Sequence, residues 1–458
     1  MSLRLQSLTL AIASISFASA AQAAGLDRST QPSWGFTQDG TFAYIERITI
    51  DPSITGKDNA ATTPSPTTYE EGRDINNMAL NYDFINYGAK ADINDKVSVG
   101  VFFDQPWGAD VEFKGTNDFV NGTEQAALAA KAAKAAAAKA ADAAKADPAN
   151  QILAYTAVKT EREAGAAYNI ASNIAQHPNE GTNASVDSKN FTGLVGVKFG
   201  EKNNWQVYGG PVLQKLEGEV HLRGTAYNST QGYDGIFAQS NGYGWMAGLA
   251  YSKPEIALKA ALTYRSDIDH DTVAYESMPA TGKSGSYDMT ITTPKSVNVD
   301  FQTGLNPTTL LTAKLRWVPW SDFSIKPPLY NATTKKAVGA DFKPLYPNGL
   351  NLIDYSEDGW AAEVGLGKKL SNQWAVSGSV GWDSGAGDPT TTLGPVEGHW
   401  NVGLGAKYNV TPEVAVSAGV KYLMFGDAKS KIPNGDLVGD FQNNDAWIYG
   451  LRLTYQKK

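Results

Sequence analysis

The chain lacks cysteine and has few groups suited to catalysis or metal binding. The absence of cysteine excludes disulfides, thiol chemistry and a lipid-modified N-terminal cysteine. Only 4 histidines occur, and their scattered positions do not match the spacing of metal ligands. The formal net charge of −8 provides no basic stripe for a nucleic acid. The sequence therefore predicts no cofactor, no metal site and no nucleic-acid partner.

Catalytic motifs are also missing. No serine lies in a G-x-S-x-G elbow, and Gly282-Lys283-Ser284 lacks the upstream glycine of a phosphate-binding loop. The richest acidic group, Asp267, Asp269, His270 and Asp271, falls at the predicted base of a long loop, where we interpret it as a solvated group rather than a cation site. We therefore predict that the protein is not an enzyme.

The mature chain has no segment suited to a transmembrane helix. Its one long run of low polarity, 126–146, contains Lys131, Lys134, Lys139 and Lys145. Each lysine costs about 2.5–3.5 kcal/mol near the centre of a bilayer. We expect this run to stay in water.

The N-terminus has the features of a secretory signal peptide. Arg4 supplies the positive charge, residues 8–20 form the apolar stretch, and Ala21-Gln22-Ala23 is a cleavage site of small residues. The predicted signal peptide is 1–23, and the mature protein begins near Ala24. An exported chain without cysteine fits a bacterial envelope.

What the sequence does contain is repeated alternation of apolar and small or polar residues. It has 45 Gly, 21 Tyr, 16 Phe and 11 Trp, with a mean hydropathy of −0.31. In the last strand, the apolar positions are Trp447, Tyr449, Leu451, Leu453 and Tyr455. Strands of about 9–11 residues with one apolar face suit a transmembrane β-barrel, whose other face lines a polar lumen.

About fourteen such strands are predicted, at 41–51, 77–91, 96–104, 189–200, 204–223, 242–252, 255–267, 295–304, 309–319, 359–369, 373–383, 398–409, 413–425 and 445–455. Short turns follow the even strands and long connectors follow the odd ones, which is typical of outer-membrane barrels. The fold class is therefore an all-β, antiparallel transmembrane barrel over 41–458, with both ends on the periplasmic side. A short segment, 24–40, precedes it and is expected to be a reduced plug.

The longest connector, 105–188, is predicted to be an extracellular loop with two helices. Residues 124–146 and roughly 149–175 have high helix propensity, and Asp147-Pro148 separates them. Two interpretations stay open. The helices either cap the pore mouth, with lysines on lipopolysaccharide phosphates, or form a passive surface insertion.

The third strand carries an irregularity. Its alternation meets Gln105-Pro106-Trp107-Gly108, where proline cannot donate to the ladder and glycine permits a bend. Either the strand ends at 104 or the barrel wall has a gap here. The candidate ligand-pathway residues are Phe103, Gln105, Pro106, Trp107, Gly108, Val111 and Phe113.

The chain resembles the FadL family of long-chain fatty-acid and hydrophobic-compound transporters of Gram-negative outer membranes. The resembling segments are 24–29, 94–100 leading into 105–110, 205–210, 244–248, 261–266, 316–321 and 422–426, of which Leu262-Thr263-Tyr264-Arg265-Ser266 is the most specific. The resemblance implies a fourteen-stranded barrel, loops that capture an apolar ligand, and lateral exit at a kink in the third strand. The sequence departs from the family in its short N-terminal stretch and in the position of its helical insertion.

We therefore expect passive uptake of hydrophobic molecules, with fatty acids or aromatic hydrocarbons as the classes that the resemblance implies. A diffusion porin for small polar solutes is the alternative, and an adhesin or structural barrel is a third possibility. The expected partners are the hydrophobic ligand, outer-membrane lipid and lipopolysaccharide, and the barrel is predicted to be a monomer.

Overall fold

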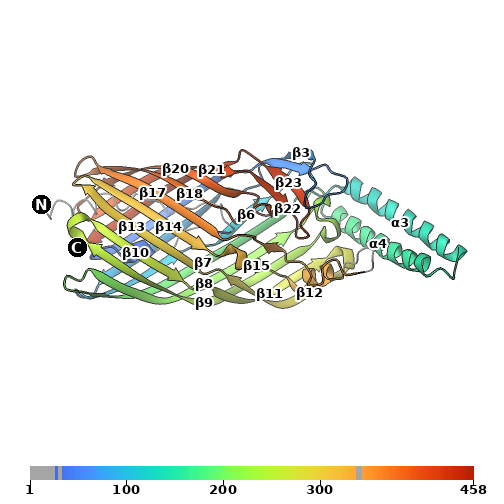
Figure 1. Ribbon diagram of the computed structural model, residues 1–458, viewed down its shortest axis with the longest axis horizontal. Coiled ribbons are helices and arrows are strands. Elements are labelled where there is room, and N and C mark those ends of the chain that lie inside the picture. The colour runs from blue at the N-terminus through green and yellow to red at the C-terminus, as the bar shows by residue number, and fades with distance from the viewer. Residues whose placement is uncertain (1–25, 29–32, 337–342, 458) are drawn as a thin grey trace.

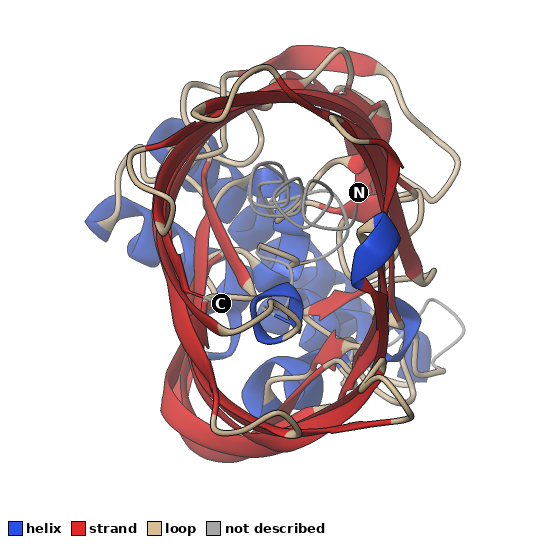
Figure 2. Ribbon diagram, turned by 90° about the vertical axis from the view of Figure 1, so that its left-hand side faces the viewer, coloured by secondary structure: helices blue, strands red, loops and turns tan. Residues whose placement is uncertain are grey.

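The structure, a computed structural model, describes residues 26–28, 33–336 and 343–457. The predicted signal peptide, 1–23, lies outside the described residues. Seventeen strand segments form one antiparallel sheet that closes where β1 (Thr41–Ser53) pairs with β24 (Asp445–Lys457). Because three wall strands are each interrupted once, these segments make a barrel of fourteen strands, which Figure 2 shows end-on. The predicted fold class is confirmed.

The wall strands between these two are, in chain order, β4 (Tyr82–Asp92), β5 (Val97–Asp104) with β6 (Gly108–Glu112), β7 (Asn183–Phe199), β8 (Trp205–His221), β9 (Asp234–Lys253), β10 (Leu258–Arg265) with β11 (Ile268–Met278), β12 (Lys283–Thr293) with β13 (Ser296–Asn306), β14 (Thr309–Val318), β17 (Gly359–Lys369), β18 (Trp374–Asp383), β20 (Glu397–Asn409) and β21 (Val414–Gly426). Each of the fourteen predicted ranges overlaps one of these strands.

The outward faces are those that the alternation predicted. In β24, Tyr449, Leu451 and Leu453 are exposed, whereas Arg452 and Thr454 are buried in the lumen. Aromatic pairs lie at both ends of the apolar belt, as expected where a barrel meets the two membrane interfaces. Examples are Trp205–Tyr251 and Trp374–Tyr408 near the short turns, and Trp245–Tyr264 and Trp317–Trp360 nearer the long loops.

The short turns and the C-terminal end of β24 lie at one end of the barrel, and the long connectors lie at the other (Figure 1). We call these the turn end and the loop end. Several strands extend further toward the loop end than the sequence predicted: β6, β11 and β12 lie in regions predicted as loops. The connector between the third and fourth strands is therefore 113–182 and not 105–188.

This extension corrects the interpretation of the acidic group at 267–271. The group lies mostly in strand β11 rather than in a loop, so successive side chains face opposite ways. Asp269 and Asp271 are exposed outside the barrel, whereas His270 is buried inside it. Among the described residues, no cluster of metal-ligating side chains occurs.

The loop end is filled by folded connectors. Five short strands form a second sheet: β2 (Gly56–Asn59), β3 (Glu71–Ile75), β19 (Thr390–Thr391), β22 (Ala428–Lys431) and β23 (Leu437–Phe441). The remaining short elements are α2 (Ser33–Phe36), α5 (Pro328–Thr334), β15 (Ser324–Ile325), β16 (Ile353–Asp354), and the 3-10 helices η1 (Thr225–Thr230), η2 (Pro254–Ile256), η3 (Pro279–Thr281) and η4 (Trp320–Asp322). Burial raises the pKa of Tyr227 in η1 to about 12, so its hydroxyl stays protonated and donates to Thr392 over 3.1 Å. Such contacts tie the connectors to one another.

The two predicted helices, α3 (Thr123–Ala146) and α4 (Gln151–Gln176), pack against each other as a hairpin that projects beyond the loop end (Figure 1). Asn150 caps α4, since its side chain accepts hydrogen bonds from the backbone N–H groups of Ile152 and Leu153. A bridge between Val120 and Gly181 closes the base of the hairpin. None of the described helices combines the length and hydrophobicity needed to cross a membrane.

Removing the distal hairpin should leave the barrel intact. Deletion of 131–168, rejoined by a short Gly-Ser turn, keeps the buried Ala126 and Ile174 at the base. We expect the heat-modifiable mobility of the folded barrel on a gel, and its uptake of a hydrophobic solute, to match the parent. Loss of uptake in a folded variant would instead support a cap over the pore mouth.

Candidate functional site

The third wall strand is interrupted between β5 and β6. Asp104 pairs with Asn190 of β7, and the next pair joins Gly108 to Asp187. Three residues, 105–107, therefore lie opposite two residues of β7, which is a β-bulge with one extra residue. We call this interruption the third-strand break.

The break reverses which side chains face the lumen. Before it, Phe103 points outward and lies between Tyr87 and Phe191, with ring centres 4.8 and 5.0 Å away. After it, Val111 and Phe113 are buried inside the barrel. Because neighbouring residues alternate faces, one extra residue moves every following side chain to the opposite face.

The residues of the break itself turn inward. Trp107 is only 1% exposed, and its ring lies 5.4 Å from that of Trp320, across the lumen. The guanidinium of Arg316 lies 5.7 Å from the centre of the Trp107 ring. Pro106 is buried and Gln105 is half-buried. The predicted pathway residues thus divide into Phe103 on the outer surface and Trp107, Val111 and Phe113 on the inner one.

On one side, the third strand loses its neighbour β4. The ladder between β4 and β5 covers 87–92 of β4, and contact resumes at an isolated bridge between Ala79 and Val111. Within the described part of the chain, no ladder pair or backbone hydrogen bond joins 81–86 to 104–109. The wall therefore has an unpaired stretch at the break.

The N-terminal segment takes the place of the missing neighbour. The backbone N–H of Arg28 donates to the carbonyl of Pro106 over 2.7 Å, and the N–H of Gly108 donates to the carbonyl of Leu26 over 2.9 Å. Buried backbone groups need such partners. Residues 26–28 therefore hold the break from inside.

Arg28 fills the unpaired stretch of wall. Its guanidinium lies 4.5 Å from the centre of the Tyr82 ring on β4, and it pairs with Asp187 of β7 at 3.4 Å. A Cβ on Gly108 would lie 2.1 Å from the guanidinium carbon, so a larger residue at this position would displace the Arg28 side chain. Arg28 is buried and closes the opening.

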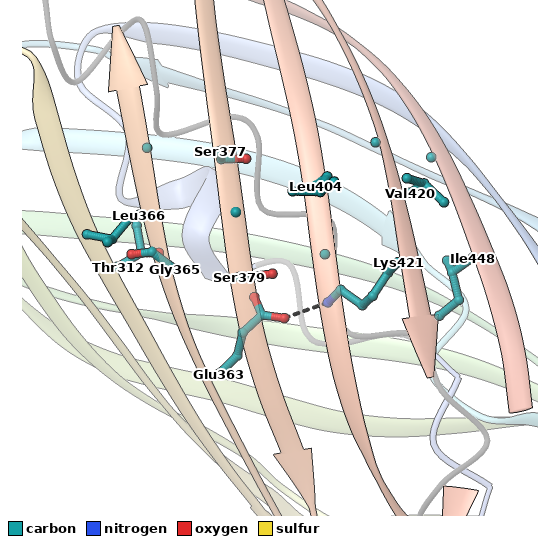
Figure 3. A pocket seen from close by; sticks show the side chains of 15 residues that line it. Thr312, Glu363, Gly365, Leu366, Ser377, Ser379, Leu404, Val420, Lys421 and Ile448 are labelled. Carbon is teal, nitrogen blue, oxygen red and sulfur yellow. Dashed lines mark hydrogen bonds and ion pairs between the residues drawn. The ribbon is translucent and has the colours of Figure 1, made fainter. Parts of the chain in front are cut away.

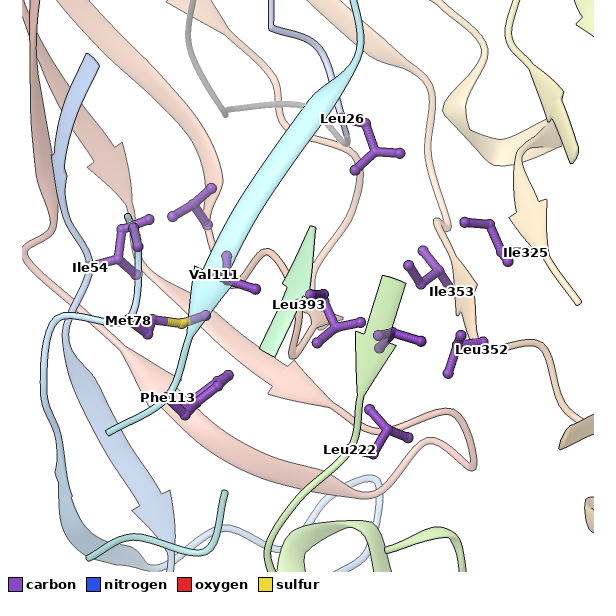
Figure 4. Packing of buried hydrophobic residues seen from close by; sticks show 14 of the residues in the cluster. Leu26, Ile54, Met78, Val111, Phe113, Leu222, Ile325, Leu352, Ile353 and Leu393 are labelled. Atoms are coloured by element: carbon purple, nitrogen blue, oxygen red, sulfur yellow. The ribbon is translucent and has the colours of Figure 1, made fainter. Parts of the chain in front are cut away.

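An apolar cavity lies behind the break, in the loop half of the lumen. Leu26 and Trp107 line it on the side of the break, and its other walls come from β7, β8, β9, the β11–β12 hairpin and the connector after β14. Figure 4 shows Leu26, Val111, Ile325 and Ile353 within the surrounding hydrophobic cluster. The free space is about 40 Å³, which holds only a few water molecules. A larger molecule must therefore displace side chains.

Buried ion pairs lie in the lumen nearer its middle, between neighbouring strands or between strands further apart. They are Asp27–Arg316 (2.6 Å), Glu46–Arg452 (2.5 Å), Asp104–Arg265 (3.4 Å) and Glu363–Lys421 (2.5 Å). Figure 3 shows Glu363 and Lys421 reaching toward each other from neighbouring parts of the wall. These inward charges are thus paired with one another, rather than arranged as opposed rows around a water-filled constriction.

The turn end of the lumen is separate and polar. Phe36 of α2 packs against Phe102 and Tyr208, with ring centres 6.3 and 5.3 Å away, and Trp34 lies 4.6 Å from the guanidinium of Arg452. Toward the turns, polar residues such as Asp92, Lys198 and Lys259 line a vestibule of about 690 Å³. The short N-terminal segment therefore lies between the apolar cavity and the vestibule.

Sequence reasoning did not find Arg28, Tyr82, Asp187 or Trp320. Their roles depend on contacts between segments distant in the chain, for which a single sequence gives no signal. Arg28 does lie in the 24–29 stretch that carried the family resemblance, but nothing there indicated that its side chain reaches the wall.

Comparison with known proteins agrees with this architecture. The profile of a family described as outer membrane protein transport protein (OMPP1/FadL/TodX) matches residues 37–456. A Pseudomonas aeruginosa FadL homologue has 14% identity and a TM-score of 0.62, covering 97% of this chain and 99% of that one. The Pseudomonas putida toluene transporter TodX has 10% identity and a TM-score of 0.52, covering 98% and 97%. The Ralstonia pickettii toluene transporter TbuX has 10% identity and a TM-score of 0.51, covering 98% of each chain. No curated protein matches the sequence.

Gly108→Ala should detach the N-terminal segment from the break. The added methyl overlaps Arg28, and such overpacking costs about 1–3 kcal/mol. A single reporter cysteine at buried Leu26 should then react with a maleimide roughly tenfold faster. Gly193→Ala is the matched control, because a Cβ there meets nothing within 4 Å. Equal labelling in both variants would show that Arg28 does not depend on this glycine.

Proposed function

Because the chain belongs to the OMPP1/FadL/TodX family and is an outer-membrane β-barrel transport protein, we propose that it takes up hydrophobic small molecules passively. The candidate classes are long-chain fatty acids and aromatic hydrocarbons. No catalytic step and no cofactor is part of this proposal. Two of the structurally similar proteins are described as toluene transporters, which supports the aromatic class.

The apolar cavity is the observation that carries the proposal. Leu26, Trp107, Phe323 and Leu352 contribute to a lining that is apolar over most of its surface. Apolar surface that leaves water for such a site gains about 25 cal/mol per Å². A channel for sugars or ions needs a hydrated path instead, and here hydrophobic side chains fill the loop half of the lumen.

We further propose that the ligand leaves sideways through the third-strand break. Trp107 borders both the cavity and the break, and Gly108, Val111 and Phe113 continue the strand beyond it. On a path along the barrel axis from the cavity to the turn end, a hydrophobic molecule meets buried ion pairs, whose disruption costs about 3–5 kcal/mol each. The sideways route requires only that Arg28 and its segment withdraw, and it delivers an apolar molecule to lipid rather than to the polar vestibule.

The proposed partners are outer-membrane lipid and lipopolysaccharide around a monomeric barrel. The lysines of α3 are exposed and suited to lipopolysaccharide phosphates. An adhesin or structural barrel would need no cavity next to a break in the wall, so we rank it below transport.

Deleting Pro106 should block uptake while preserving the barrel. The deletion removes the one extra residue of the third strand, so the ladder with β7 becomes regular and the opening closes. Uptake of radiolabelled toluene or oleate by cells should fall at least about tenfold, as expected when a gating step is abolished. Pro106→Ala is the control, because it keeps the extra residue. Undiminished uptake by the folded deletion variant would contradict lateral exit.

Proteoliposomes separate this function from that of a diffusion porin. Because the lumen is filled and its charges are paired, vesicles that contain the protein should not swell faster in isosmotic sugar than empty vesicles do. Rapid swelling that falls with the size of the sugar would establish the porin alternative instead.

A further inference from the structure

The wall has a second interruption, in its seventh and eighth strands. β10 ends at Arg265 and β11 begins at Ile268, while β12 ends at Thr293 and β13 begins at Ser296. Arg265 and Ile268 both point into the lumen although they are three positions apart, so the alternation is broken between them. The β11–β12 hairpin therefore has its own ladder, separate from that of β10 and β13.

At this place the sixth strand, β9, loses its partner. Residues 246–253 of β9 pair with β10, and residues 234–237 of β9 pair with β11. Among the described residues, no ladder pair or backbone hydrogen bond joins 239–244 to 267–273. We call this unpaired stretch between β9 and β11 the seventh-strand break.

Two side chains close the seventh-strand break from inside. Ile268 lies against Gly242 and Gly244 of β9, where an added Cβ would be 2.4 and 2.6 Å from its carbons. His270 lies beside Gly242 and is held by a 2.8 Å hydrogen bond to Gln214. The two glycines allow this close approach, so the closure depends on side-chain packing and not on the ladder.

The apolar cavity reaches this second break. Phe237 and Ala238 on β9 and Thr272 on β11 line one side of it, while Leu26 and Trp107 line the side of the third-strand break. One cavity thus touches both interruptions of the wall.

The seventh-strand break lies at the outer limit of the apolar belt. Tyr243 and Trp245 of β9 are 78% and 51% exposed on the outer surface, whereas the outward residues of β11 beside them are Asp269 and Asp271. Aromatic residues followed by acidic ones mark the interface between lipid and water. Unpaired backbone is tolerated there because water can satisfy it, unlike in the bilayer interior.

We propose that the seventh-strand break is a side portal through which uncharged hydrophobic molecules dissolved in the outer leaflet reach the apolar cavity. Residues 266–273 bend away from β9, which withdraws Ile268 and His270, while 274–277 of β11 stay paired with β9. Asp269 and Asp271 at the rim disfavour carboxylates, so the portal selects neutral molecules over fatty-acid anions. This inference rests on the proposed function, because the portal leads into the same cavity from which the molecule leaves through the third-strand break.

A disulfide across the break tests the portal, and the absence of native cysteine makes the test clean. An added Cβ at Gly242 would lie 2.4 Å from a γ-carbon of Ile268, so Gly242→Cys with Ile268→Cys puts two thiols side by side across the break. A disulfide needs Cβ atoms about 3.5–4.5 Å apart. In cells that express the oxidised variant, uptake of radiolabelled toluene should fall at least about fivefold and recover on reduction. Equal uptake in the oxidised and reduced states would overturn the portal.

The control disulfide joins the same two strands away from the break. Ala250 and Ala261 pair directly and both face the lumen. A disulfide formed by Ala250→Cys and Ala261→Cys therefore links β9 to β10 and leaves β9 and β11 unlinked at the portal. Its oxidation should not change toluene uptake, and an equal loss in this control would overturn the assignment.

A second variant tests the portal without a disulfide. Ile268→Ala with His270→Ala removes the closing side chains and should raise toluene uptake at least about twofold, and unchanged uptake in the folded variant would overturn the portal. Failure of the portal is distinguishable from failure of the proposed function. If deletion of Pro106 blocks toluene uptake and the oxidised disulfide does not, only the portal is wrong. If deletion of Pro106 has no effect either, lateral exit itself is wrong.

Discussion

The hydrogen-bond ladder of the wall is the constraint on which the rest of the structure depends. Peptide groups in lipid must find partners within the protein, and the antiparallel sheet meets this demand by closing β1 on β24. Where the ladder is interrupted, something else must take its place. At the third strand, the backbone of Leu26 and Arg28 supplies the hydrogen bonds and the Arg28 side chain fills the space. The short N-terminal segment is therefore part of the wall as well as a partial filling of the lumen.

The inside of the barrel divides into two chemically different halves. Toward the loop end it is a hydrophobic core, and toward the turn end it is a polar vestibule, with buried ion pairs and α2 between them. A hydrophobic molecule in the loop half of the lumen has no favourable path along the barrel axis. The division supports our proposal that openings in the side of the wall, and not a central pore, connect the cavity to its surroundings.

The sequence was sufficient to predict the strands of the membrane belt and their number. There the outer face is apolar and the inner face is small or polar, so residues such as Leu451 and Arg452 alternate clearly. The irregularity at Pro106 and Gly108 was also visible, because these residues disfavour a regular ladder. Recognition of the family then matched what the profile comparison shows.

Two features could not be predicted, for physical reasons. Toward the loop end the amphipathic pattern inverts: in β1, Ile48 and Ile50 face inward, and in β11 the acids face outward while His270 is buried. A search for outward apolar faces therefore took β11 for part of a loop. The position of Arg28 was hidden because its contacts join the start of the chain to β4 and β7.

Our central proposal is that the apolar cavity holds the transported molecule next to the third-strand break. Photolabelling with a diazirine derivative of toluene tests it most directly, because the label marks residues that the bound molecule touches. We expect mass spectrometry to find the label on cavity residues such as Trp107 and Trp320. Labelling confined to the outer apolar belt, or to the polar vestibule, would contradict it.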